Sequence, residues 1–301
     1  MSLRDRHQRM VVLARTHGID TLCVETETEL EMAIRGLTED PPERLIVCAG
    51  DGTVQAVVTA LATLSDQDRP ELLVLGGGRT NYTARDVATH RRPEKLLAWA
   101  ARAGHDVPHS TRHSLIIRQD GQADRHGFFV AGARINDVIR DCHRYRSRGS
   151  GWLRRGHVSS AWRVSQLGLK AIFGQQNFPD HHFSINAGLP GQLTGSVRLL
   201  LLTTLEHPGA AVNPYAERNQ GKIRISAVST SAQRFWQRLP RMLRGRYHAA
   251  MTPEQGYLSG RSTGIEINGL SEICLDGQEH DYCPKTKISF LPGPAFKFIH
   301  P

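Results

Sequence analysis

Two short stretches of the sequence combine glycines with side chains that can work on phosphates. The first, AGDGT at residues 49–53, follows an apolar run at residues 45–49 and precedes apolar residues at helical spacing. Gly50 and Gly52 let the backbone turn sharply and approach a ligand, while the N–H groups that open the helix point toward it. Asp51 would repel a phosphate directly, so it indicates a divalent cation between them or a hydroxyl or water held beside the phosphates. Thr53 could cap the helix or donate to a phosphate oxygen.

The second stretch, LGGGRTNYTARDV at residues 75–87, repeats the order of strand, glycine turn and helix one unit later. In an open α/β sheet both turns then face the carboxyl edge, where ligands bind. Arg79 could hold a phosphate through two hydrogen bonds, or project into solvent. For the first turn, the alternative is that Asp51 caps the helix while the glycines make a tight turn.

The first third of the chain predicts parallel strands that alternate with helices. Residues 19–24, 45–49 and 71–75 read as strands, and a Thr28-x-x-Glu31 capping box opens the helix after the first of them. After about residue 108 the pattern becomes mainly antiparallel, with hairpin signals at residues 113–131 and strands at 184, 192–205, 222–228 and 264–275. Residues 152–173 and 231–244 read as helices, and we expect Pro240 to kink or break the second. The fold class is therefore an α/β domain with a Rossmann-like parallel sheet, followed by a mainly antiparallel, β-sandwich-like domain. We place the domains at residues 1–108 and 109–286, with residues 287–301 as a candidate final strand of the first.

The composition favours an acidic partner. The 301 residues carry a net charge of +9 with a pI near 9.7, and much of the excess lies in residues 140–163 and 234–248. Such a balance suits nucleic acid, an anionic membrane surface or a phosphorylated substrate, although a basic run by itself more often is a solvated helix face. The five scattered cysteines lack CxxC spacing, so we expect reduced thiols and no structural zinc. No apolar run is long enough to span a membrane, and the start does not read as a signal peptide, so we expect a cytoplasmic protein.

The two glycine turns together resemble the catalytic domain of the diacylglycerol kinase and sphingosine kinase family of lipid kinases. That family is marked by a GGDGT turn and a later segment containing GT, N, A and R. The resemblance continues through FFVAGARINDVI, NPYAERNQGKIRISAV, LRGRYH, IEINGLSEICLDGQ and GPAFKFIHP, so it runs in order from about residue 20 to the C-terminus.

The resemblance implies ATP and Mg²⁺ as cofactors and gives each candidate residue a role. The nucleotide site would comprise Gly50, Asp51, Gly52, Thr53, Gly78, Arg79, Thr80, Asn81 and Arg85, with Asp51 near the metal ion. Asp276 matches the acid expected to act as general base on the lipid hydroxyl. Taken by itself, Asp276 would read as part of a plain Asp-Gly turn.

Several positions depart from the family pattern. The family's first strand and its Asn-Pro-x-Ser-Gly loop have no counterpart, so we expect either a truncated chain or altered nucleotide binding. Arg79 and Thr80 stand where the family usually has Thr and Gly. Gln220 replaces an acid, which argues against a structural magnesium site there, and Gln278 replaces a glutamate, which would weaken catalysis.

We therefore predict an ATP-dependent kinase acting on a hydroxyl of diacylglycerol or a related lipid, with a lipid substrate and peripheral contact with the anionic inner membrane surface. A non-catalytic lipid- or nucleotide-binding relative and a kinase of a soluble metabolite such as NAD remain as alternatives. We expect no nucleic-acid partner, and leave an oligomer open. For residues 231–244, a helix that packs Phe235 and its apolar neighbours on the second domain is weighed against one that settles on anionic lipid. Asp180 to His182 resembles a metal site, but adjacent histidines on a strand point to opposite faces.

Overall fold

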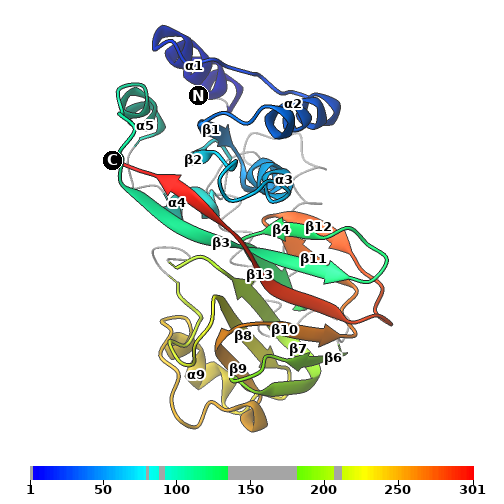
Figure 1. Cartoon of the computed structure of the whole chain (residues 1–301). Helices are drawn as coiled ribbons and strands as arrows, with labels where there is room; N and C mark the ends of the chain where they lie inside the picture. The colour runs from blue at the N-terminus through cyan, green and yellow to red at the C-terminus, as the bar shows by residue number, and fades with distance from the viewer. Residues whose placement is uncertain (1–2, 79–80, 88–91, 135–181, 207–211) are drawn as a thin grey trace, which may run out of the picture.

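The protein, described by a computed structural model, has an α/β part above a strand-rich part (Figure 1). The structure describes residues 3–78, 81–87, 92–134, 182–206 and 212–301. The elements of the first part are α1 (Leu3–Thr16), α2 (Glu27–Glu39), β1 (Arg44–Ala49), α3 (Asp51–Leu61), β2 (Glu71–Gly76), α4 (Tyr82–Val87) and α5 (Pro93–Ala100).

A parallel sheet lies at the centre of this first part. β1 pairs in parallel with β2 from Arg44↔Glu71 to Ala49↔Gly76. Because side chains alternate along β2, Leu72 and Val74 pack with α3 and α4, whereas the two leucines between and after them, at positions 73 and 75, pack with α1 and α5. Helices therefore cover both faces of the sheet, as the predicted α/β class requires.

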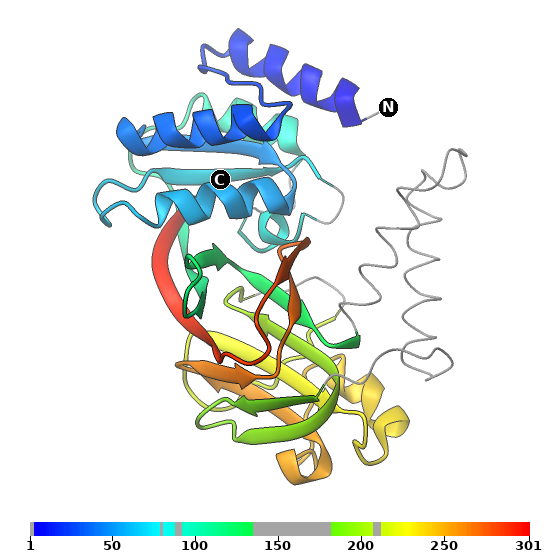
Figure 2. The same cartoon turned by 90° about the vertical axis from the view of Figure 1, so that its right-hand side faces the viewer.

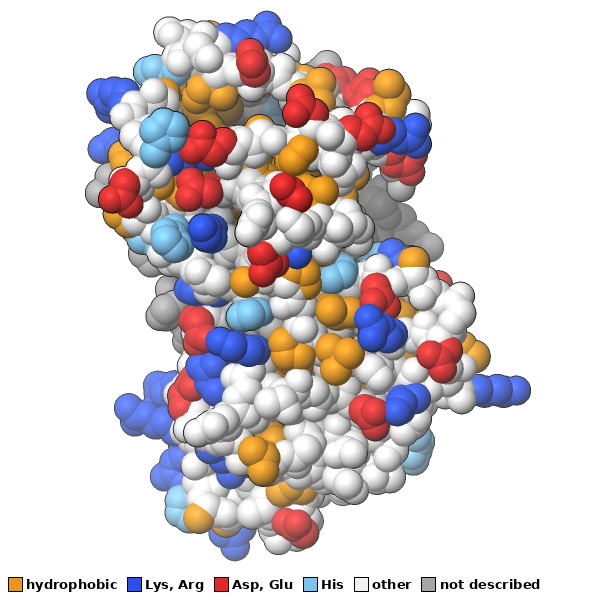
Figure 3. All heavy atoms as spheres, in the orientation of Figure 1, with side chains coloured by type: hydrophobic (Ala, Val, Ile, Leu, Met, Phe, Trp, Pro, Cys, Tyr) orange, Lys and Arg blue, Asp and Glu red, His pale blue; other side chains and the backbone are white. Residues whose placement is uncertain are grey.

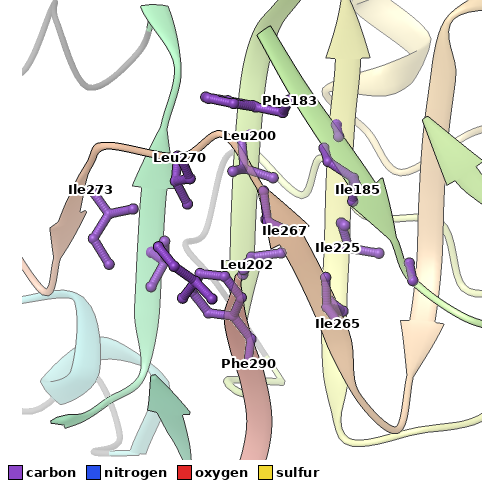
Figure 4. Packing of buried hydrophobic residues seen from close by; sticks show 14 of the residues in the cluster. Phe183, Ile185, Leu200, Leu202, Ile225, Ile265, Ile267, Leu270, Ile273 and Phe290 are labelled. Atoms are coloured by element: carbon purple, nitrogen blue, oxygen red, sulfur yellow. The ribbon is translucent and has the colours of Figure 1, made fainter. Parts of the chain in front are cut away.

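The second part is mostly antiparallel. Its elements are β3 (His109–Gln119), β4 (Arg125–Gly127), β5 (Phe129–Gly132), β6 (His182–Asn186), β7 (Gln192–Thr203), β8 (Ile223–Ser229), α9 (Phe235–Met242), the 3₁₀ turn η1 (Pro253–Gln255), β9 (Tyr257–Ser262), β10 (Ile265–Asn268), β11 (Glu272–Leu275), β12 (Gln278–Asp281) and β13 (Ile288–Ile299). Apolar side chains from its strands share one buried core, part of which Figure 4 shows. The predicted antiparallel character of this part is confirmed.

The long strand β13 connects the two parts. It pairs antiparallel with β3 along most of its length, and near its end Phe298 pairs in parallel with Leu72 of β2. Figures 1 and 2 show it running from the strand-rich part up to the first sheet. β13 therefore adds a strand to the parallel sheet, while the domain boundary at residue 108 stays a proposal.

Two local predictions near the N-terminus are wrong. Residues 19–24 form no strand, and Leu22 is 74% exposed, because no neighbouring strand is there to pair with an otherwise strand-like run. The capping box uses Thr26 and Glu29 instead of Thr28 and Glu31. Both pairs fit the motif, but the earlier one also lets the Glu29 carboxylate accept from two backbone N–H groups ahead of the helix.

Further differences concern the second part. The run at residues 264–275 is two strands, because Gly269 adopts φ 89° between them and brings the chain against the carbonyl of His182. Pro240 was expected to kink or break α9, and the helix continues through it to Met242, so it is not broken there. The predicted helix at 152–173 and the acid and first histidine of the Asp180 to His182 stretch lie outside the described residues. Within the described ranges no cysteine forms a disulfide. No helix there has the length and apolar character needed to cross a bilayer.

Candidate active site

The first glycine turn leaves the start of α3 open to a ligand. Gly50 is the residue before the helix, with extended backbone at φ −80° and ψ 169°, and no side chain caps the helix start. The first backbone hydrogen bond there runs from the N–H of Val54 to the carbonyl of Gly50. The amides of residues 51 to 53 thus lie at an uncapped helix N-terminus, which favours an anion. Thr53 is half-buried in this first turn.

The second glycine turn lies directly against the first. The N–H of Gly77 donates to the carbonyl of Ala49 at 2.9 Å, and a Cβ built on Gly78 would come 2.6 Å from the Cα of Gly50. Asn81, at φ 50°, shapes this turn with its side chain: Oδ1 accepts from the Gly78 N–H at 2.8 Å, and Nδ2 donates to the Gly78 carbonyl at 2.9 Å. The structure therefore brings both turns together at the carboxyl edge of β1 and β2, while Arg79 and Thr80 lie outside the described residues.

Asp51 joins the two turns. Its Oδ1 accepts a hydrogen bond from the backbone N–H of Thr83 at 3.1 Å, at the start of α4. Burial raises the pKa of the half-buried Asp51 carboxyl, while the backbone N–H groups of Tyr82, Thr83 and Asn81 and the charge of Arg85 oppose that shift. The carboxylate thus stabilises the N-terminus of α4, with the exposed Arg85 close enough to act on its charge.

Asp276 reaches the same place from the second part of the chain. With Gly277 it forms the two-residue turn between β11 and β12, at φ 47° and 89°, the geometry that Asp-Gly favours. Unlike an ordinary turn residue it is only 5% exposed, and its two carboxylate oxygens accept from the N–H groups of Phe128 and Phe129, each at 2.9 Å. Burial, together with the negative charge of Asp51, raises its pKa to about 8 against the opposing effect of those N–H groups.

The side chain of Gln278 crosses from the β11–β12 turn onto the first glycine turn. A Cβ built on Gly52 would lie 2.7 Å from Nε2 of Gln278, so only glycine admits this side chain as it stands. From the sequence, Gln278 is expected only to weaken catalysis, and its place over Gly52 is not predicted. A glycine in the first turn of a helix was the available signal, since glycine is unfavourable there unless something approaches closely.

Aromatic rings close the junction behind Asp276. The rings of Tyr82 and Phe129 lie 4.8 Å apart, and burial raises the pKa of Tyr82 to about 12, with the charge of Asp86 adding to it. Asp86 itself pairs with Arg112 at 2.6 Å. The contact between Tyr82 of α4 and Phe129 of β5 was not predicted from the sequence, because nothing in either segment marks the other as its neighbour.

The residues fit a nucleotide better than a metal ion held by protein alone. The uncapped α3 N-terminus can take a phosphate group. In the part of the chain that the structure describes, no group of three or more His, Cys, Asp or Glu residues could hold a metal ion. Mg²⁺ commonly binds through one or two carboxylates together with substrate phosphates, and Asp51 suits that arrangement.

Comparisons with known proteins relate the first part of the chain to one kinase family. A model of the diacylglycerol kinase catalytic domain matches residues 3–108. No curated protein matches the chain by sequence.

Solved structures match over nearly the whole chain. A candidate diacylglycerol kinase from Bacillus anthracis superimposes with a TM-score of 0.63 and 16% identity, over 94% of this chain and 86% of that one. A further structure, of a diacylglycerol kinase from the same organism, gives 0.58 and 14% identity, over 94% and 85%. At such identities the likeness concerns the fold, and it extends to the strand-rich part beyond residue 108.

Proposed function

We propose that this chain, whose residues 3–108 match the diacylglycerol kinase catalytic domain, transfers a phosphoryl group from ATP to a hydroxyl group of a lipid such as diacylglycerol. One observation carries the proposal: the buried carboxyl of Asp276, from the second part of the chain, lies close enough to the glycine turns for the charge of Asp51 to raise its pKa, and Gln278 of the same hairpin lies over Gly52. A kinase needs such a meeting of phosphate-binding amides and a proton acceptor.

The amides at the start of α3 would bind nucleotide phosphates, and Gly78 lets the second turn approach the first closely enough to join them. A magnesium ion bound to the nucleotide would neutralise charge on the phosphate oxygens. Asp51 would be its protein ligand, and the exposed Arg85 supplies positive charge nearby.

Asp276 would accept the proton of the acceptor hydroxyl as the hydroxyl oxygen bonds to the γ-phosphorus of ATP and the bond from that phosphorus to the leaving ADP breaks. A general base works best when its pKa lies near the working pH, and burial brings the pKa of Asp276 to about 8. The N–H groups of Phe128 and Phe129 hold both carboxylate oxygens in place. This fixed orientation supports transfer to one hydroxyl position.

Incorporation of labelled phosphate from ATP into a lipid extract tests the proposal. We expect label in the organic phase with the unaltered protein, and none with Asp51→Ala or Asp276→Ala. Label only in the aqueous phase would overturn the lipid acceptor in favour of a soluble metabolite. No transfer at all, with ATP bound, would leave the non-catalytic relative as the correct alternative.

A further inference from the structure

The helix α9 has one side buried in the protein. Phe235 and Met242 are 7% and 1% exposed and pack in a cluster with Val228, Met251 and Tyr257. The expectation that this helix packs its apolar side on the second domain therefore holds for these residues. It does not account for the rest of the helix.

The outer side of α9 combines exposed arginines with an exposed tryptophan. Trp236 is 43% exposed, and its neighbours on this side and in the following turn are exposed as well: Arg234, Gln237, Pro240, Arg241, Arg244 and Arg246. We call these seven residues the α9 surface. In Figure 3, Lys and Arg side chains gather at the lower left of the visible face, where Figure 1 places α9.

No acid balances this charge. Residues 234–253 contain five Arg residues and no Asp or Glu. Within the described ranges, the arginines of the α9 surface form no ion pair with a carboxylate. A helix face that was merely solvated would more often mix charges of both signs, as exposed helix faces do.

The ring of Trp236 is held in place and still faces solvent. It packs against Phe235 with ring centroids 4.9 Å apart, and the guanidinium of Arg198 lies over Phe235 at 4.6 Å and over Trp236 at 5.9 Å. An exposed, fixed indole beside arginines suits a membrane interface, where the ring enters the headgroup region and the cations contact anionic lipid.

We propose that the α9 surface binds an anionic membrane and holds the enzyme at the bilayer that contains its acceptor. The proposal rests on the proposed function for the identity of the acceptor, although the surface itself is independent of the chemistry. One observation favours a membrane over a nucleic acid: the exposed apolar residues Trp236 and Pro240 lie among the arginines. Both side chains would gain free energy from leaving water.

Flotation with lipid vesicles tests the proposal on the full chain. We expect binding to vesicles that contain phosphatidylglycerol, weak binding to phosphatidylcholine alone, and loss of binding at high salt. The double variant Arg241→Gln/Arg244→Gln should lower partitioning at least about tenfold, because each basic residue near an anionic surface contributes about a fivefold change. The matched control Lys95→Gln/Arg102→Gln removes two exposed charges near α5 and should bind like the unaltered protein.

The part played by Trp236 is read from fluorescence. Vesicles should shift the emission of the unaltered protein to the blue, and Trp236→Ala should lose that shift and bind more weakly, at an unchanged melting temperature. Equal binding by the α9 variants and the control would overturn the proposal. The proposal would also be overturned, in favour of nucleic acid, if the unaltered protein bound DNA but no vesicles and the α9 variants lost the DNA binding.

Kinase assays separate this proposal from the proposed function. With the acceptor in detergent micelles, we expect the α9 variants to be as active as the unaltered protein, whereas on anionic vesicles they should be slower. Vesicle binding lost in the variants, with no lipid phosphorylation by any form, would support the surface and contradict the kinase. If the variants phosphorylated lipid on vesicles as fast as the unaltered protein, the result would support the kinase and contradict the role of the α9 surface.

Discussion

Replacing Gly78 by alanine tests the contact between the two glycine turns. The added Cβ would lie 2.6 Å from the Cα of Gly50, and the obstacle is backbone, which no rotamer change can clear. Since carbon atoms pack at about 3.5–4.0 Å, the turns would have to separate by about 1 Å. Overpacking of this kind costs about 1–3 kcal/mol, so we expect a melting temperature a few degrees lower.

The same displacement should affect phosphoryl transfer more than stability. A shift of 1 Å in groups that position a substrate can lower the rate about 100-fold. We therefore expect Gly78→Ala to reduce kcat/KM for ATP by about two orders of magnitude. Thermal unfolding, nucleotide titration and labelled-phosphate incorporation measure the three effects.

Gly50→Ala is the matched control, because it adds a methyl group on the other side of the same contact between the two turns. Its Cβ would lie 3.5 Å from the Cα of Gly78, an ordinary contact, and its φ of −80° suits alanine. Loss of a favourable residue before the helix, about 0.5–1 kcal/mol, is offset by a similar entropic gain from the unfolded chain. If Gly78→Ala proves as stable and as active as Gly50→Ala, the two turns are not in contact in solution, and the site as described here is wrong.

Three further predictions concern the polar residues of the site. Asp276→Asn should abolish transfer and remove a pH dependence of stability. Because the carboxyl pKa is raised from 3.8 to about 8 in the folded state, its contribution to the free energy of unfolding is fully present below pH 4 and is lost as the pH rises to 8. In urea unfolding, the variant should therefore gain stability relative to the unaltered protein between pH 5 and pH 8. Asp51→Ala should lose about 0.5–2 kcal/mol of stability with the capping of α4, whereas Asp51→Asn keeps an acceptor oxygen, melts closer to the unaltered protein and still lacks transfer. Gln278→Glu should weaken ATP binding measured without Mg²⁺ by about tenfold, because it places a carboxylate against Gly52 where phosphate would bind, and added Mg²⁺ should recover part of the loss.

The sequence predicted the elements that carry the first half of the site. A continuous apolar run, a glycine and a helical repeat suffice to place β1, Gly50 and α3, because each of these signals is local. The same logic failed at residues 19–24, where a strand needs a partner that the sequence cannot show. It also chose the wrong one of two overlapping capping boxes, since Thr26 and Thr28 satisfy the same spacing rule.

The second half of the site was predictable only by resemblance. Asp276 lies in a dipeptide that reads as a surface turn, and its carboxylate is held by the N–H groups of Phe128 and Phe129, nearly 150 positions away. The contact of Gln278 with Gly52 likewise joins residues from the two parts of the chain. Such contacts are fixed by the docking of one part on the other, which leaves no periodic or compositional signal in either segment.

A purely structural role explains the position of Asp51 better than that of Asp276. For Asp51 the alternative was that it caps its own helix, α3, but no side chain caps that helix, and the half-buried carboxylate instead accepts a hydrogen bond at the N-terminus of α4. For Asp276 a structural role explains less, because the turn would form equally well with an exposed side chain, and burying a carboxyl near a second one costs stability. A residue that destabilises the fold without shaping it is typical of a functional site. The burial of Asp276 is therefore a stronger argument for catalysis than the glycine turn that first drew attention to Asp51.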